Sequence, residues 1–116
     1  MKSTGLKVTV HPVHDLDAAR QVYGAVFGEP YVDQPYYVAY RAGDREVGLD
    51  PNGHRQGMTG PVSFWSVPDV TAAVAAVVAA GGREHQAPRD VGGGSLTALV
   101  ADADGNLIGL VQDPPA

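Results

Sequence analysis

The chain has 116 residues and a formal net charge of −5, with 44% hydrophobic and 18% charged residues. This length and balance are typical of one folded domain and exclude a disordered chain. The acidic balance and the scattered Lys and Arg residues argue against a nucleic-acid partner, and the absence of cysteine excludes disulfides and cysteine-ligated metals.

The first half of the chain predicts a strand, a helix and three further strands. Residues 6–13 mix Val with alternating Thr and His, as a strand does. Asp15 is a good N-cap for a helix that ends at Gly28, because the apolar residues between them keep helical spacing. The remaining strands are predicted on either side of a tight turn at residues 43–44, over residues 29–33, 36–42 and 46–50.

The second half of the chain repeats this order after an irregular stretch. Residues 51–60 carry Pro, Asn and Gly without periodicity and predict a linker. A strand at 62–67 and a helix capped by Asp69 come next, followed by strands at 83–89, 96–101 and 107–112. We therefore divide a single domain, residues 1–116, into a βαβββ module at 5–50, a linker at 51–60 and a second βαβββ module at 61–113.

Neither targeting nor membrane insertion is indicated. The N-terminal stretch, Met1 to Gly5, lacks the apolar segment of a secretory signal. The longest run of small apolar residues, Ala72 to Ala80, is about half of what a membrane-spanning helix needs. We expect a soluble, cytoplasmic protein with no membrane partner.

The two modules are copies of one another. Asp15-Leu16-Asp17-Ala18-Ala19 returns 54 residues later as Asp69-Val70-Thr71-Ala72-Ala73, and Gly28 returns as Gly82 at the same spacing. Each copy closes on a similar strand, Val47-Gly48-Leu49 in the first and Ile108-Gly109-Leu110 in the second. Repeats of this kind identify equivalent positions in the two halves.

The duplicated unit resembles the vicinal oxygen chelate superfamily, also called the glyoxalase/bleomycin-resistance/dioxygenase family. The resemblance rests on residues 12–19 and on residues 102–108, which follow the family's hairpin before its last strand, with Ala103 where Pro is usual. It implies an α+β fold in which two βαβββ modules form curled half-barrel mixed sheets, with the ligand cavity on their concave faces. It also implies a homodimer.

The same resemblance locates the family's metal ligands and shows that they are missing. Metal-dependent members carry one ligand on the first strand and one on the last strand of each module, which here are Val8, Gly48, Val62 and Gly109. Valine and glycine side chains cannot coordinate a metal ion, which needs three or four N or O donors. We therefore expect no metal and no cofactor.

Strand periodicity assigns the faces of each sheet. It predicts that Val38 and Tyr40 pack on the helix while Tyr37, Ala39 and Arg41 line the cavity. The leading hypothesis is a metal-free protein that binds a small, partly aromatic molecule, such as an antibiotic or natural product that it sequesters, with Gly48 and Gly109 leaving room for it. The expected ligand-binding residues are Val8, Val10, Tyr37, Arg41, Gly48, Asp50, Phe64, Leu99 and Gly109.

Three alternatives stay open at this point. The first is a glyoxalase- or dioxygenase-type enzyme with a displaced metal site built from Glu46, Asp50, His11 or His54. The second is a metal-free enzyme in which Asp50 or Glu46 acts as the general base. The third is a structural or regulatory dimer whose cavity is filled.

Overall fold

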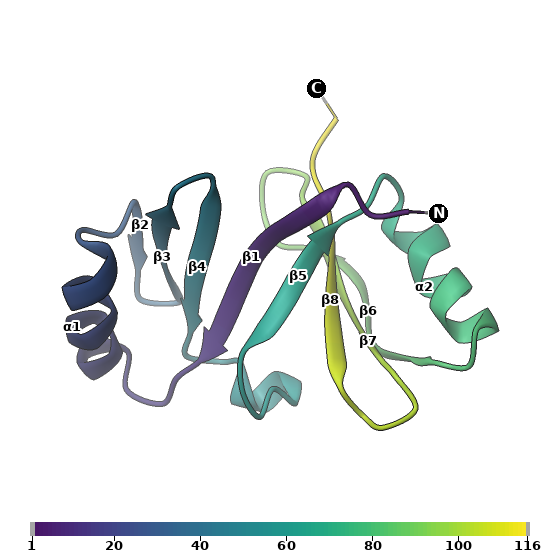
Figure 1. Cartoon of the computed structure of the whole chain (residues 1–116), viewed down its shortest axis with the longest axis horizontal. Helices are drawn as coiled ribbons and strands as arrows, with labels where there is room; N and C mark the ends of the chain where they lie inside the picture. Colours follow the sequence, from purple (N-terminus) through teal and green to yellow (C-terminus); the bar gives the residue numbers. More distant parts are fainter. Residues whose placement is uncertain (1, 116) are drawn as a thin grey trace. The chain divides into compact units, whose positions relative to one another are not determined.

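The computed structural model describes residues 2–115 and divides the chain into two compact units. Unit 2 comprises Val8–Val62, and unit 1 comprises the residues up to Lys7 together with those from Ser63 onward. Figure 1 shows that each unit carries one helix beside a set of strands. No helix of the described residues is long and apolar enough to cross a membrane.

Unit 2 holds a four-stranded mixed sheet in the order β2-β3-β4-β1. The strand β1 pairs in parallel with β4, while β2 with β3 and β3 with β4 pair antiparallel. This unit contains β1 (Gly5–Pro12) from Val8 onward, α1 (Leu16–Phe27), β2 (Val32–Gln34), β3 (Tyr37–Ala42), β4 (Arg45–Asp50) and the short 3₁₀ helix η1 (His54–Gln56).

The helix α1 begins where the sequence predicts, because the Asp15 carboxylate accepts a hydrogen bond from the Ala18 amide at 3.0 Å. Its inner side packs on Val38, Tyr40 and Leu49, which are fully buried. The Tyr40 hydroxyl also donates to the carbonyl of Arg20 at 3.1 Å, so the helix is fixed to β3 by a polar contact as well. The predicted helix-facing role of Val38 and Tyr40 is therefore confirmed.

Unit 1 repeats this arrangement with strands in the order β5-β8-β7-β6. Here β5 pairs in parallel with β8, and β8 with β7 and β7 with β6 pair antiparallel. Asp69 caps α2 as Asp15 caps α1, through a 3.0 Å bond to the Ala72 amide. The elements are β5 (Val62–Ser66), α2 (Val70–Ala79), β6 (Arg83–Asp90), β7 (Leu96–Ala101) and β8 (Leu107–Gln112).

The α+β fold of two βαβββ modules with mixed sheets is thus confirmed, with most element ends within one or two residues of the prediction. The largest local differences are that β2 begins at Val32 rather than Glu29, and that the predicted linker contains η1. Each helix has its own core, and that of unit 1 contains Val67, Val70, Ala73, Val74, Ala98, Val100 and Leu110.

Candidate functional site

The predicted ligand-binding residues of unit 2 lie on the sheet face that points away from α1, here called the far face. Alternate residues of a strand share a face, and the register pairs Arg41 with Glu46 and Ala39 with Gly48. Val10 of β1 lies opposite Gly48 on its other side. The far face is therefore formed by Val8 and Val10 of β1, Tyr37, Ala39 and Arg41 of β3, and Glu46, Gly48 and Asp50 of β4.

A carboxylate held by two phenols is the central polar feature of this face. The Tyr37 hydroxyl donates to Oε2 of Glu46 at 2.8 Å, and the Tyr31 hydroxyl donates to Oε1 of the same carboxylate. Glu46 and Tyr37 are half-buried, whereas Tyr31 is 46% exposed. Both oxygens of Glu46 thus accept a hydrogen bond from an uncharged donor, which orients the carboxylate without neutralising it.

The two phenols hold their protons more tightly than a free tyrosine does. Burial, together with the hydrogen bond and negative charge of Glu46, raises the pKa of Tyr31 to about 12. Burial raises the pKa of Tyr37 as well, and the charges of Glu46 and Asp50 add to it. Both hydroxyls therefore remain hydrogen-bond donors at neutral pH.

An arginine of the same sheet stacks on this cluster. The guanidinium carbon of Arg41 lies 4.2 Å from the ring centroid of Tyr31, within the range of a cation–π contact. Arg41 is exposed and pairs across the strands with Glu46. The four side chains, Tyr31, Tyr37, Arg41 and Glu46, are called the tyrosine–glutamate cluster below.

The space that the sequence suggested above Gly48 is occupied. A Cβ atom added to Gly48 would lie 2.7 Å from Cζ of Tyr37, so the Tyr37 ring covers this glycine. The prediction that Gly48 leaves room for a ligand is therefore wrong for this arrangement of Tyr37. Asp50 lies further along the same face, where it accepts hydrogen bonds from the Asn52 amide at 2.8 Å and from Gln56 at 3.3 Å.

The equivalent glycine of unit 1 is covered in the same way. Phe64 of β5 pairs directly with Gly109 of β8, and a Cβ added to Gly109 would lie 2.7 Å from Cδ1 of the Phe64 ring. Leu99 pairs with Gly109 from the other side and is 1% exposed. The prediction of room above Gly109 is therefore wrong too, and Phe64, Leu99 and Gly109 form a tight apolar stack.

Sequence reasoning names Glu46 as a candidate metal ligand or general base, but it misses Tyr31. Strand alternation in a strand covering residues 29–33 would align Tyr31 with Tyr40, on the helix side. The strand begins only at Val32, and Tyr31 precedes it with its amide bonded to the Ala39 carbonyl at 2.9 Å. Tyr31 therefore lies outside the strand, where the alternation of side chains between the two faces does not apply, and its hydroxyl bonds to Glu46 on the far face.

The residues proposed for a displaced metal site do not converge. His11 packs against Tyr23 of α1, with ring centroids 5.1 Å apart, and its burial lowers its pKa. His54 stacks on His14 at 3.9 Å. Within residues 2–115, no group of three or more His, Asp or Glu side chains is arranged to hold a metal ion. Val8 and Gly48 likewise supply no donor atom from the far face.

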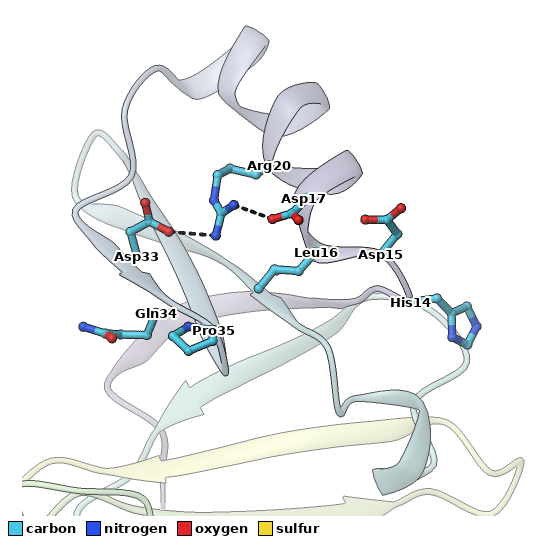
Figure 2. Close-up of a pocket in the computed structure, with 8 residues that line it drawn as sticks. All are labelled: His14, Asp15, Leu16, Asp17, Arg20, Asp33, Gln34 and Pro35. Carbon is cyan, nitrogen blue, oxygen red and sulfur yellow. Dashed lines mark hydrogen bonds and ion pairs between the residues drawn. The ribbon is translucent and has the colours of Figure 1, made fainter.

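A separate open pocket of about 640 Å³ lies where α1 begins, beside β2 (Figure 2). Its polar groups bond to one another: Arg20 forms ion pairs with Asp17 at 2.8 Å and with Asp33 at 2.9 Å. Asp15 is used as the helix cap. The pocket contains none of the predicted ligand-binding residues, and its arginine is paired with two of its carboxylates, so we place the candidate site at the tyrosine–glutamate cluster.

The chain matches one protein-family model and resembles several solved structures. A family model described as the Glyoxalase/Bleomycin resistance protein/Dioxygenase superfamily matches residues 5–110. Among curated protein sequences, none matches the chain.

Several solved structures share the fold at low sequence identity. Methylmalonyl-CoA epimerase from Streptomyces coelicolor superposes with a TM-score of 0.74 at 21% identity, covering 98% of this chain and 100% of that one. A superfamily member from Vibrio splendidus 12B01 gives 0.69 at 19% identity, covering 93% and 99%. A protein described as an NAD-dependent benzaldehyde dehydrogenase from Legionella pneumophila gives 0.73 at 13%, covering 90% and 96%. These likenesses establish the fold, and the function must be argued from the site.

Proposed function

The chain belongs to the Glyoxalase/Bleomycin resistance protein/Dioxygenase superfamily, and on this premise we propose that it binds a small, partly aromatic molecule without a metal ion. The binding surface is the far face of unit 2, around the tyrosine–glutamate cluster. Sequestration of an antibiotic or another natural product is the function that such binding would serve.

The observation that supports this proposal is the arrangement of Glu46 between two tyrosine hydroxyls on a sheet face that is in part exposed. Tyrosine offers a rigid apolar ring with a polar end, and such rings are common in sites that combine packing with orientation. Asp50 and Arg41 add charged groups at either end of the same face. A binding site needs these features, and it needs no nucleophile.

The alternative is an enzyme of this superfamily that uses a displaced metal site or a carboxylate base. No described group of ligands favours the displaced metal. A base must lie within reach of the proton that it abstracts. Each oxygen of Glu46 and Asp50 accepts one hydrogen bond from the chain itself; these bonds anchor the two carboxylates, but nothing in the arrangement marks either one as a base. Binding therefore has the better support.

The direct test is a fragment titration of ¹⁵N-labelled protein with small aromatic compounds. We expect shifts in the backbone amides of residues 37–41 and 46–50, and weaker binding in Tyr37→Leu. Tyr36→Leu is the matched control, because Tyr36 is 65% exposed and lies outside the cluster. Shifts confined to the α1 pocket at residues 14–20 and 33–35 would contradict this placement of the site.

The same experiment separates binding from catalysis. After prolonged incubation with the protein, a bound compound recovered by mass spectrometry should be unchanged. A new product that appears only with the protein, and disappears in Glu46→Gln, would establish the enzyme alternative instead. Homodimer formation is part of the proposal on the grounds of the family resemblance, and light scattering of the purified protein measures it.

A further inference from the structure

We propose that the tyrosine–glutamate cluster selects an organic cation, and that the guanidinium of Arg41 occupies the cation's place when no ligand is bound. This inference rests on the proposed function and adds the chemical class of the ligand. The ligand would carry a guanidinium, amidinium or ammonium group on a partly aromatic molecule.

The first argument is the charge of the cluster. Glu46 accepts hydrogen bonds only from the neutral hydroxyls of Tyr31 and Tyr37, and it forms no ion pair with any residue from 2 to 115. Asp50 on the same face is bonded to an amide and to a glutamine side chain, both uncharged. Two partly buried carboxylates thus lack an ion pair, although Arg41 lies nearby on the Tyr31 ring, and a cationic ligand would supply one.

The second argument is what Arg41 does. Its guanidinium stacks on the Tyr31 ring at 4.2 Å instead of pairing with a carboxylate. A tyrosine face beside a carboxylate is the surface that guanidinium and ammonium groups bind. The structure therefore already shows a cation on this ring, supplied by the chain itself.

The third argument is that Arg41 can leave. The side chain is exposed and lies close to the end of β3, so it can turn into water. A ligand cation would then take the same ring face and come closer to Glu46. Arg41 and the ligand cation compete for one place on the Tyr31 ring. This competition lowers the affinity of the protein for the ligand.

The test compares three probes of nearly the same shape: benzamidine, which is cationic, benzamide, which is neutral, and benzoate, which is anionic. We expect benzamidine to bind about tenfold more tightly than benzamide, as a cation–π contact and a nearby carboxylate would give. Benzoate should be the weakest. Binding is measured by ¹⁵N chemical-shift titration of the full chain.

Four variants identify the source of the preference. Glu46→Gln keeps the size of the side chain and removes its charge, so benzamidine should bind no better than benzamide. Arg41→Ala should tighten benzamidine binding by about threefold to tenfold, because the internal competitor is gone. Arg45→Ala removes the same charge from the opposite face of β4 and should change binding by less than about twofold. Tyr31→Leu should abolish the preference.

Each outcome decides the matter. Equal binding of benzamidine and benzamide would overturn the cation inference and leave the proposed binding function intact. Equal gains in Arg41→Ala and Arg45→Ala would overturn it too, since overall charge alone would then explain the effect. Failure of all three probes to bind, together with failure of the aromatic fragments above, would contradict the proposed function itself.

Discussion

At the scale of single residues, two equivalent glycines, one in each unit, are each covered by an aromatic ring. At Gly48 and at Gly109, an aromatic ring from a neighbouring strand takes the space that a Cβ atom would need. The rings differ in kind: Phe64 is 8% exposed and packed, while Tyr37 ends in a hydroxyl that bonds to Glu46. An added methyl group is therefore expected to act differently at the two glycines: at Gly109 it meets a packed ring, and at Gly48 a ring whose hydroxyl bonds to Glu46.

Gly109→Ala should destabilise the protein by about 1–3 kcal/mol, the usual cost of overpacking a core. The added Cβ would lie 2.7 Å from Cδ1 of Phe64, which has little space to move. Urea denaturation measures the loss. In a Phe64→Ala background the same change should cost clearly less, and an equal cost in both backgrounds would contradict the ring–glycine contact.

The tyrosine–glutamate cluster predicts a pH dependence. The pKa of Tyr31 is raised to about 12, above the value near 10 of an unfolded tyrosine. The contribution of the protonated Tyr31 hydroxyl to the free energy of unfolding is therefore complete below about pH 10. It is lost as the pH rises toward 12, because tyrosine in the unfolded chain releases its proton at lower pH than Tyr31 in the folded protein. Glu46→Gln removes the charge that adds to the effect of burial on both phenols, so absorbance at 295 nm should show Tyr31 and Tyr37 titrating at lower pH in the variant. An unchanged titration would contradict the contribution of Glu46 to the pKa of either phenol.

At the scale of elements, the turn between β7 and β8 shows how one carboxylate shapes a hairpin. Asp102 accepts hydrogen bonds at 2.9 Å from the Asp104 amide, the Asn106 amide and the Asn106 side chain. The bonds from Asn106 lower the pKa of Asp102. Gly105 completes the turn with φ of 86°, a conformation that favours glycine.

Asn106→Ala should raise the pKa of Asp102 toward its ordinary value, since a charge-stabilising hydrogen bond is removed. A lowered carboxyl pKa contributes stability above the pKa of the unfolded state, and this is lost as the pH falls through the folded value. Carboxyl ¹³C titration by NMR follows Asp102 directly. Asp104→Ala is the matched control, because Asp104 contributes only its backbone amide, and it should leave the pKa of Asp102 unchanged.

The sequence predicted the elements well where a single residue marks a boundary. Asp15 and Asp69 cap both helices, and alternation placed Val38 and Tyr40 on the helix side. Alternation specifies a face but not the direction that a ring takes across the neighbouring strand. The covering of Gly48 by Tyr37, and the reach of Tyr31 to Glu46, depend on that direction and could not be predicted.

At the scale of the whole molecule, duplication specifies the fold of both units and leaves the chemistry to individual side chains. Strand order and helix caps agree between the copies. At the four positions where the family resemblance places metal ligands, both copies carry valine and glycine: Val8 and Gly48 in one, Val62 and Gly109 in the other.

These four residues predict that ligand binding does not depend on a divalent metal ion. Treatment with EDTA should leave the benzamidine affinity and the Tm unchanged. A metal ion that binds only the folded state would raise the Tm, so one equivalent of Mn²⁺, Ni²⁺ or Zn²⁺ should leave the Tm unchanged if the chain has no such site. Calorimetry and elemental analysis of protein purified without chelator provide the measurements. One bound ion per chain, lost together with ligand binding in EDTA, would show that the ligands of a metal-dependent member have been replaced by others in this chain.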